Sequence, residues 1–204
     1  MNKKAHWESV YKEKSPLEVS WHQKKPTISL ALIKKISQNH TDNIIDVGGG
    51  ASTLADFLLE DGFNNITVLD LSSNALAHAK QRLGDKSTLI EWTVEDVTNF
   101  VATHKYDIWH DRAVFHFLTA KDDRDKYKEV LESSINTGGC VIIAAFSIGG
   151  PQKCSGLDIV QYDAVKLKNE LGNNFTLIEE QHENHITPAG KEQEFGYYVF
   201  AKNA

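Results

Sequence analysis

Short apolar runs alternate along the chain with stretches in which apolar residues recur at helical spacing. The runs predict seven strands, at residues 43–48, 65–70, 87–93, 106–110, 139–146, 175–179 and 197–201. A continuous apolar run is typical of a strand buried on both faces of a parallel sheet. The stretches between the runs predict helices that begin near residues 52, 72, 122 and 163.

This order of elements predicts an α/β fold, with a seven-stranded, mostly parallel sheet and helices on both faces. The last two runs have no helix-length pattern between them, so we expect them to pair through a long polar connection, with an antiparallel last strand at about 194–202. We expect one domain over residues 1–204, in which residues 1–40 form a helical flap outside the sheet and residues 41–204 form the core.

Composition narrows the class of protein. The 204 residues carry 22 basic and 28 acidic side chains, a net charge of −6, and 41% of them are hydrophobic. These values are typical of soluble globular proteins, and no apolar run is long enough to span a membrane. The two cysteines and the absence of a secretory signal favour a reduced, cytoplasmic setting. The acidic balance argues against nucleic acid as a partner.

A glycine-rich loop follows the first predicted strand. Asp46 lies near the end of that strand, and Gly48, Gly49 and Gly50 lead into a helix. Glycines at such a turn let a ligand approach the main chain, and the helix start offers free N–H donors. A dinucleotide loop would place another glycine where Thr53 stands, so the fit to a pyrophosphate is poor.

Two further acids follow the next two predicted strands. Asp70 ends the second strand and can accept both hydroxyls of a ribose, while Leu71 can cover an adenine face. Asp96 follows the third strand, beside Val97, and can accept a hydrogen bond from the adenine amine. A single such acid is commonly only a helix cap. Together with the glycine loop, however, the two acids predict a nucleoside site at the carboxyl edge of the sheet.

These features resemble the class I S-adenosylmethionine-dependent methyltransferases, in particular small bacterial members of unassigned substrate. The resemblance covers about residues 40–202, and the family's acid-x-Gly-x-Gly motif is matched by Asp46, Gly48 and Gly50, with Ser52 where a further glycine is common. It implies a Rossmann-like fold and S-adenosyl-L-methionine as cofactor. The implied cofactor-binding residues are Trp21, Asp46, Gly48, Gly49, Gly50, Asp70, Leu71, Asp96, Val97 and His110.

The segment after the fourth strand is rich in titratable groups. It reads His110-Asp111-Arg112-Ala113, where amide and exocyclic-amine methyltransferases carry an Asn/Asp-Pro-Pro-aromatic tetrad. We expect Asp111 or His110 as a general base and His116 facing the substrate. A structural role is the alternative for each, and Arg112 either binds an acidic acceptor or pairs with a nearby acid.

Other kinds of site are disfavoured. No histidine pair has the spacing at which a helix points both rings at one metal ion, so we expect no metal. We expect Cys140 in the core, and Cys154 exposed in a loop without a partner. Thr53 and the final strand pair disfavour a nicotinamide dehydrogenase.

The sequence therefore predicts an enzyme that transfers a methyl group from S-adenosylmethionine to a nucleophilic acceptor. We expect a small-molecule acceptor, because the compact chain shows no added recognition domain. A protein side chain such as lysine is the alternative acceptor, and a catalytically inactive nucleoside-binding module is the alternative function. A membrane partner is not expected.

Overall fold

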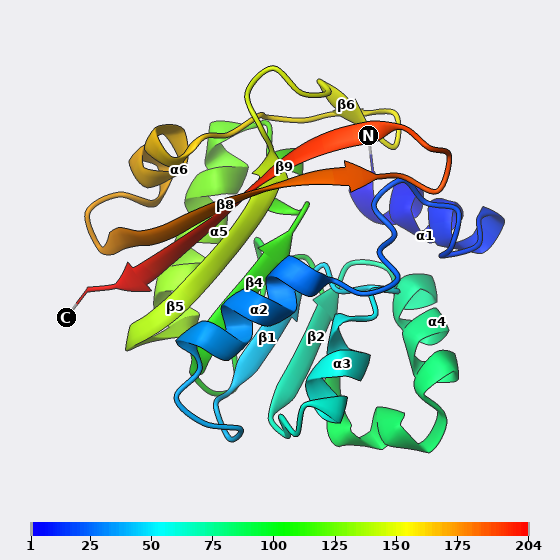
Figure 1. Cartoon of the computed structure of the whole chain (residues 1–204), viewed down its shortest axis with the longest axis horizontal. Coiled ribbons are helices and arrows are strands. Elements are labelled where there is room, and N and C mark those ends of the chain that lie inside the picture. The colour runs from blue at the N-terminus through cyan, green and yellow to red at the C-terminus, as the bar shows by residue number, and fades with distance from the viewer. Residues whose placement is uncertain (1, 204) are drawn as a thin grey trace.

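The computed structural model describes residues 2–203, which form a twisted seven-stranded sheet in the order β3-β2-β1-β4-β5-β9-β8 (Figure 1). The strands are β1 Ile44–Val47, β2 Ile66–Asp70, β3 Ile90–Val94, β4 Tyr106–Arg112, β5 Ile135–Phe146, β8 Phe175–Ile186 and β9 Glu192–Lys202. Only β9 runs against its neighbours β5 and β8, and the first five strands pair in parallel. The predicted α/β, Rossmann-like fold with an antiparallel last strand is confirmed.

Helices cover both faces of the sheet. They are α1 Lys3–Glu13, α2 Thr27–Ile36, α3 Leu54–Glu60, α4 Ser73–Leu83, α5 Lys121–Ser134 and α6 Ala164–Leu171, with short 3-10 turns η1 Gly84–Leu89 and η2 Phe115–Phe117. Apolar residues of α2, α3 and α4 pack into one core cluster and those of α5 and α6 into another. The two clusters lie on opposite faces of the sheet, as the positions of α2 in front and α5 behind indicate (Figure 1).

Local sequence signals account for several helix ends. The Ser72 hydroxyl accepts a hydrogen bond from the Ala75 N–H at the start of α4, and the Asp163 carboxylate does the same for Lys166 at the start of α6. Gly84 ends α4 and adopts a φ of 55°, which favours glycine.

The last two strands are longer than predicted. The polar connection expected between residues 179 and 197 is mostly strand, and only residues 187–191 join β8 to β9. β8 lies at the edge of the sheet, where its side chains alternate between half-buried and exposed positions. Polar residues can therefore form the second half of this strand, and an apolar run in the sequence marks only its first half. Two other boundaries also differ: β5 already begins at Ile135, and residues 87–89 belong to η1.

The N-terminal segment divides into two parts. Leu30, Leu32 and Ile33 of α2 are at most 3% exposed and belong to the core cluster on the α3 face. The residues before α2, which include α1, instead run past the carboxyl edge of the sheet (Figure 1). In this part, α1 contacts α4. Among the helices of the described residues, none has the length and apolar character needed to cross a membrane.

The interior strand β5, which pairs with β4 and β9, should be a main source of stability. Replacing Ile142, which is fully buried, by alanine should lower the free energy of unfolding by about 2–5 kcal/mol because it leaves a cavity. The same change at Ile186, which is 54% exposed, should alter it by less than about 0.5 kcal/mol. Denaturant unfolding of both variants measures the difference, and equal losses would contradict this account of the core.

Candidate functional site

A cavity opens at the carboxyl edge of the sheet, between the loops that follow β1 to β4 and the N-terminal segment. It contains about 830 Å³ of empty space, part of it open to solvent. Six of the residues predicted to bind the cofactor line it: Trp21, Gly48, Asp70, Leu71, Asp96 and Val97.

A second cavity, of about 550 Å³, lies beside the first and shares Tyr11, Trp21, Gly48 and Arg112 with it. Three further predicted cofactor residues, Asp46, Gly49 and His110, line this second cavity. Gly50 lines neither cavity. The two cavities together therefore bring nearly the whole predicted set to one place.

The glycine loop between β1 and α3 is closely packed. Gly48 adopts a φ of 66°, and a Cβ atom there would collide with the side chain of Val114. A Cβ atom at Gly50, whose φ is 41°, would lie 2.7 Å from an Asp70 carboxylate oxygen. Side chains at these positions would push the loop away from β4 and from Asp70, so the glycines preserve the shape of the cavity.

Asp70 presents a buried carboxyl group to the first cavity. It is 9% exposed, and one of its oxygens accepts a hydrogen bond from the Ser72 N–H at 2.7 Å. Burial raises the pKa of Asp70 to about 7, and the nearby charges of Asp46 and Glu8 act in the same direction. A donor pair from a ligand would stabilise the ionised form of this carboxyl group.

Asp96 lies in the loop that follows β3, on the same cavity wall. Its Oδ1 accepts hydrogen bonds from the backbone N–H and the hydroxyl of Thr98, at 2.9 and 2.8 Å. These contacts hold the loop in a tight turn and fix the carboxylate beside Val97, which is buried.

Aromatic side chains of the N-terminal segment form another wall of the cavity. The ring centroid of Trp7 lies 5.6 Å from that of Trp21 and 5.1 Å from that of Phe117, both in edge-to-face geometry. The Trp21 indole N–H donates to the Tyr11 hydroxyl at 3.2 Å. The segment thus covers the cavity with rings that have few polar atoms.

Glu8 fastens α1 to the start of α4. Its carboxylate accepts hydrogen bonds from the Ser72 hydroxyl, from the Ser73 N–H and hydroxyl and from the Asn74 N–H, at 2.7–3.0 Å. Partial burial opposes ionisation, but these hydrogen bonds at a helix N-terminus dominate and lower the pKa of Glu8 to about 2. Sequence analysis missed this residue, because the residues it caps lie more than 60 positions away.

Comparisons with known proteins agree with this geometry. The sequence model of a family described as "Methyltransferase domain" matches residues 45–141. A malonyl-[acyl-carrier protein] O-methyltransferase of Ilyobacter polytropus is 32% identical over 105 residues, which are 51% of this chain and 38% of that protein. The chain thus spans well under half the length of this curated relative.

Solved structures share the whole fold. A SAM-dependent methyltransferase from Anabaena variabilis has a TM-score of 0.76 at 13% identity, over 100% of this chain and 96% of that one. A 1,6-didemethyltoxoflavin-N1-methyltransferase from Burkholderia thailandensis has a TM-score of 0.72 at 16% identity, over 98% and 87% of the two chains. Residues 45–141 thus belong to a methyltransferase family, and the whole chain has the fold of S-adenosylmethionine-dependent methyltransferases.

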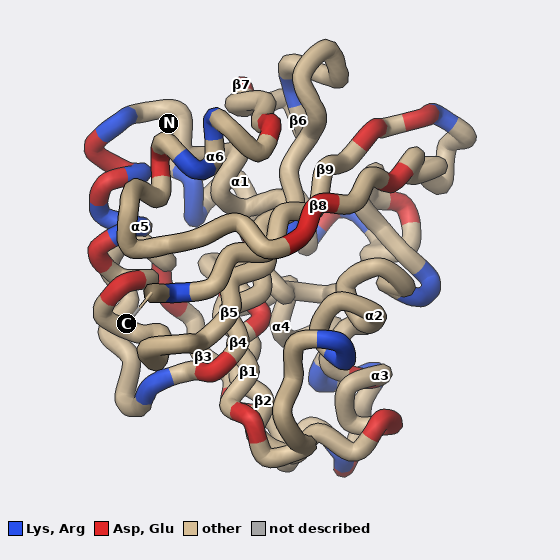
Figure 2. The backbone as a smooth tube through the Cα atoms, turned by 60° about the vertical axis from the view of Figure 1, so that its left-hand side comes forward, with Lys and Arg blue, Asp and Glu red and all other residues tan. Residues whose placement is uncertain are grey.

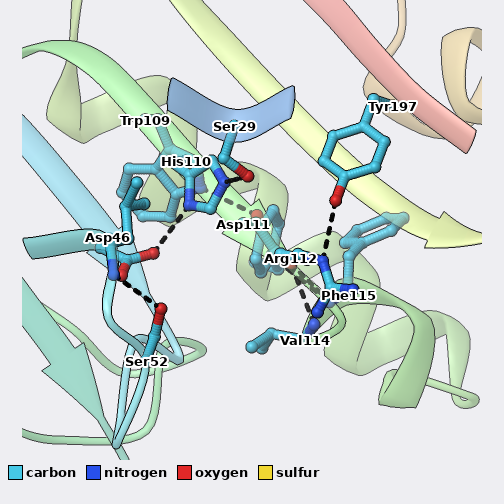
Figure 3. A network of polar contacts seen from close by, with 12 residues as sticks. Ser29, Asp46, Ser52, Trp109, His110, Asp111, Arg112, Val114, Phe115 and Tyr197 are labelled. Carbon is cyan, nitrogen blue, oxygen red and sulfur yellow. Dashed lines mark hydrogen bonds and ion pairs between the residues drawn. The ribbon is translucent and has the colours of Figure 1, made fainter. Parts of the chain in front are cut away.

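His110 lies in a buried relay of hydrogen bonds. Its Nδ1 is 2.7 Å from Asp46 Oδ1, and its Nε2 is 2.9 Å from the Ser29 hydroxyl (Figure 3). The relay connects the end of β4 to the acid of the glycine motif and to the first turn of α2. Both ring nitrogens are thereby engaged, which favours a positioning role for His110 over proton transfer.

Asp111 points away from both cavities. It is fully buried, and its oxygens accept hydrogen bonds from the N–H groups of Val114 and Phe115 and from the Tyr127 hydroxyl, at 2.8–3.3 Å. Burial raises the pKa of Asp111 to about 6 against these hydrogen bonds. The geometry therefore gives Asp111 a structural role in the turn after β4, and it does not support the predicted general base.

His116 also lies off the cavity walls. It is fully buried against the rings of Phe117 and Phe146, and neither ring nitrogen has a hydrogen-bond partner within the protein. Burial and the charge of Arg112 lower the pKa of His116 to about 3, so the ring is neutral. The geometry does not bring His116 to a position facing a substrate.

The remaining expectations concern cysteines and metals. Cys154 is not exposed as predicted: it lies in a short strand, β6 Lys153–Cys154, paired with β7 Leu157–Asp158, is 4% exposed and lines the first cavity. Burial raises the pKa of its thiol to about 11. Within residues 2–203, no group of three or more histidine, cysteine or acidic side chains is arranged to hold a metal ion.

Arg112 takes part in a network that sequence analysis only partly anticipated. Its Nε donates to the Tyr197 hydroxyl at 2.8 Å (Figure 3). Its Nη1 donates to the Trp21 carbonyl at 3.0 Å, and its Nη2 lies 3.6 Å from a Glu183 oxygen. The expected pairing with an acid is therefore present. Glu183 gave no sequence signal, because it lies in the part of β8 beyond the predicted strand. Tyr197 was predicted only as a residue of the last strand.

The structural role of Asp111 can be tested directly. Replacing Asp111 by asparagine should lower the free energy of unfolding by about 2–3 kcal/mol, since buried hydrogen bonds to a charged group are lost. Binding of S-adenosylhomocysteine to the folded variant should be unchanged, because the asparagine oxygen can still accept a hydrogen bond from the N–H groups of the turn. Denaturant unfolding and calorimetry measure the two quantities, with Asp125→Asn on the exposed face of α5 as the control. Full stability with lost turnover would restore the general-base assignment.

The contact between Glu8 and α4 should depend on pH. The pKa of Glu8 in the folded protein lies below its ordinary value of 4.5, so the contact is fully present above pH 4.5 and is lost as the pH falls towards 2. At neutral pH, Glu8→Gln should increase hydrogen exchange in α1 and change the fluorescence of Trp7. Glu13→Gln, in the same helix and bonded only to Ser9 in this structure, is the matched control. Equal exchange in both variants would contradict the capping role.

Proposed function

We propose that this protein transfers the methyl group of S-adenosylmethionine to a small-molecule acceptor. The observation that carries the proposal is the convergence of Gly48, Asp70 and Asp96, from three successive strand ends, on one cavity. Open α/β sheets bind ligands at this edge. The family to which residues 45–141 belong supports the choice of methyl donor.

Each part of the cofactor has a matching set of residues. Asp70 would accept hydrogen bonds from the ribose hydroxyls, and Asp96 would accept one from the adenine amine. Leu71 and Val97 would cover the faces of the adenine ring. The second cavity, with Gly49 and His110, would hold the amino-acid end. Trp21 lines both cavities and would lie close to the sulfonium, whose positive charge aromatic rings stabilise.

The donor supplies an activated methyl group, so the task of the protein is to align the acceptor and to exclude water. We infer that the part of the N-terminal segment before α2 acts as the flap over the cavity, whereas α2 supports the core. Trp7 and Trp21 then shield the reacting groups.

The surface supports a small acceptor. Basic and acidic residues are interspersed along the backbone of α5 and near the end of the β8–β9 hairpin (Figure 2), which is unlike the clustered basic face of a nucleic-acid-binding protein. The covering of the cavity by α1 also favours a small molecule over a protein side chain.

Binding of S-adenosylhomocysteine tests the proposal. Replacing Asp70 by asparagine should weaken binding by about 100-fold, because a charged acceptor for two hydroxyls is lost. Since burial raises the pKa of Asp70 to about 7, wild-type affinity should increase as the pH rises towards and through 7 and then level off. The variant should lack this dependence.

Calorimetric titration between pH 5.5 and 8.5 measures both effects. Asp158→Asn, at a carboxylate that is 77% exposed, is the control and should bind as the wild type does. A folded wild type that does not bind S-adenosylhomocysteine would refute the proposed function.

A further inference from the structure

We propose that the methyl acceptor is a carboxylate anion, which Arg112 attracts into the first cavity and which is methylated on oxygen. This inference rests on the proposed function and deepens it. It concerns the acceptor half of the cavity, defined here as the wall formed by Arg112, Ala113, Val114, Phe117, Leu118 and Cys154.

The charge of the acceptor half is positive. The acids Asp70, Glu95 and Asp96, which follow β2 and β3, line the part of the cavity that the nucleoside would occupy, and Lys3 of α1 also lines the cavity. Arg112 is the charged member of the acceptor half as defined. The other side chains of this half are apolar except for the thiol of Cys154, which burial keeps protonated at neutral pH by raising its pKa to about 11. An anion is therefore the form of acceptor that this wall would attract.

Arg112 is held rigidly and is incompletely neutralised. The Tyr197 hydroxyl and the Trp21 carbonyl accept hydrogen bonds from two of its N–H groups. The centroid of the Phe195 ring lies 4.4 Å from its Cζ. Its Nη2 is buried without a hydrogen-bond partner, since the nearest Glu183 oxygen is 3.6 Å away.

Glu183, in turn, does not line the cavity. Its two carboxylate oxygens accept hydrogen bonds at 2.7 Å from the Tyr197 hydroxyl and from the Gln23 side chain. The field of Arg112 therefore extends into a cavity with apolar walls, where a charge interaction is stronger than in water.

Among the described residues, the acceptor half of the cavity offers no free general base for the acceptor. Asp111 and His116 lie off its walls, and both nitrogens of His110 are engaged. Burial raises the pKa of the Tyr11 hydroxyl, which therefore stays protonated at neutral pH. An acceptor that must lose a proton, such as an alcohol or an ammonium group, has no partner here. A carboxylate is ionised at neutral pH and needs none.

The reaction balances without proton transfer. A lone pair of the carboxylate oxygen forms a bond to the methyl carbon, and the carbon–sulfur bond breaks with its electron pair remaining on sulfur. The products are a methyl ester and a neutral thioether. The negative charge of the acceptor and the positive charge of the sulfonium cancel, and a weakly polar cavity favours such a step.

Calorimetry on the full chain, saturated with S-adenosylhomocysteine, tests the recognition step. The probes are benzoate and octanoate, each compared with its neutral amide, and octylamine as a cation. We expect each carboxylate to bind at least about 10-fold more tightly than its amide, as one charge-assisted hydrogen bond provides. Equal binding of the amides, tighter binding of the amine, or no carboxylate binding would overturn the proposal.

Two variants separate charge recognition from a loss of structure. Arg112→Gln should abolish the preference for benzoate over benzamide. Glu183→Gln removes the competing negative charge but keeps hydrogen-bonding atoms for Tyr197 and Gln23, so it should bind benzoate more tightly than the wild type. If Arg112 served only to hold Trp21, both variants would weaken binding of benzoate and benzamide alike, and this outcome would refute the proposal.

The chemical class of the product gives an independent measurement. The protein is incubated with a tritiated methyl donor and a small-molecule cell extract, and the products are treated with alkali. Methyl esters release volatile labelled methanol, and Arg112→Gln should lose this release. Label that survives alkali would overturn the proposal. Failure to bind S-adenosylhomocysteine would instead contradict the proposed function, so the two failures are distinguishable.

Discussion

The buried carboxylate of Asp111 fixes the turn on which both cavities depend. By accepting the N–H groups of Val114 and Phe115 it closes the chain into a tight loop directly after β4, and the Tyr127 hydroxyl anchors that loop to α5. Val114 then fits against Gly48 of the glycine loop, and Phe117 reaches Trp7 of the flap. The glycine loop and the flap therefore both contact the turn that this acid holds.

The period of a β-strand explains why the three residues at the end of β4 differ in role. Successive side chains of a strand point to opposite faces of the sheet. His110 and Arg112 share a face and line the second cavity, whereas Asp111 faces α5 on the other side. A cluster of titratable groups in a sequence can thus contain both cavity-lining and structural members, and their separation follows from the strand register.

The first five strands, the glycine loop and the acids at Asp70 and Asp96 could be predicted because their signals are local. An apolar run predicts a buried strand, and a glycine or an acid at its end marks the ligand edge. The contacts that hold the flap have no such signal. Glu8 bonds to residues 64–66 positions away, and Arg112 and Tyr197 are 85 positions apart. The extent of β8 was also hidden, because an edge strand with one solvated face is too polar to resemble a buried one.

That same edge strand has a consequence for how copies of the protein meet. β8 presents a twelve-residue backbone edge beyond β9 that no other strand of the sheet covers, and such edges invite pairing between molecules. Glu179, Glu180 and Glu183 lie along it, so two copies aligned edge to edge would bring carboxylates of like charge together. β8, which supplies Glu183 as the acidic partner of Arg112, therefore also disfavours edge-to-edge association of two copies.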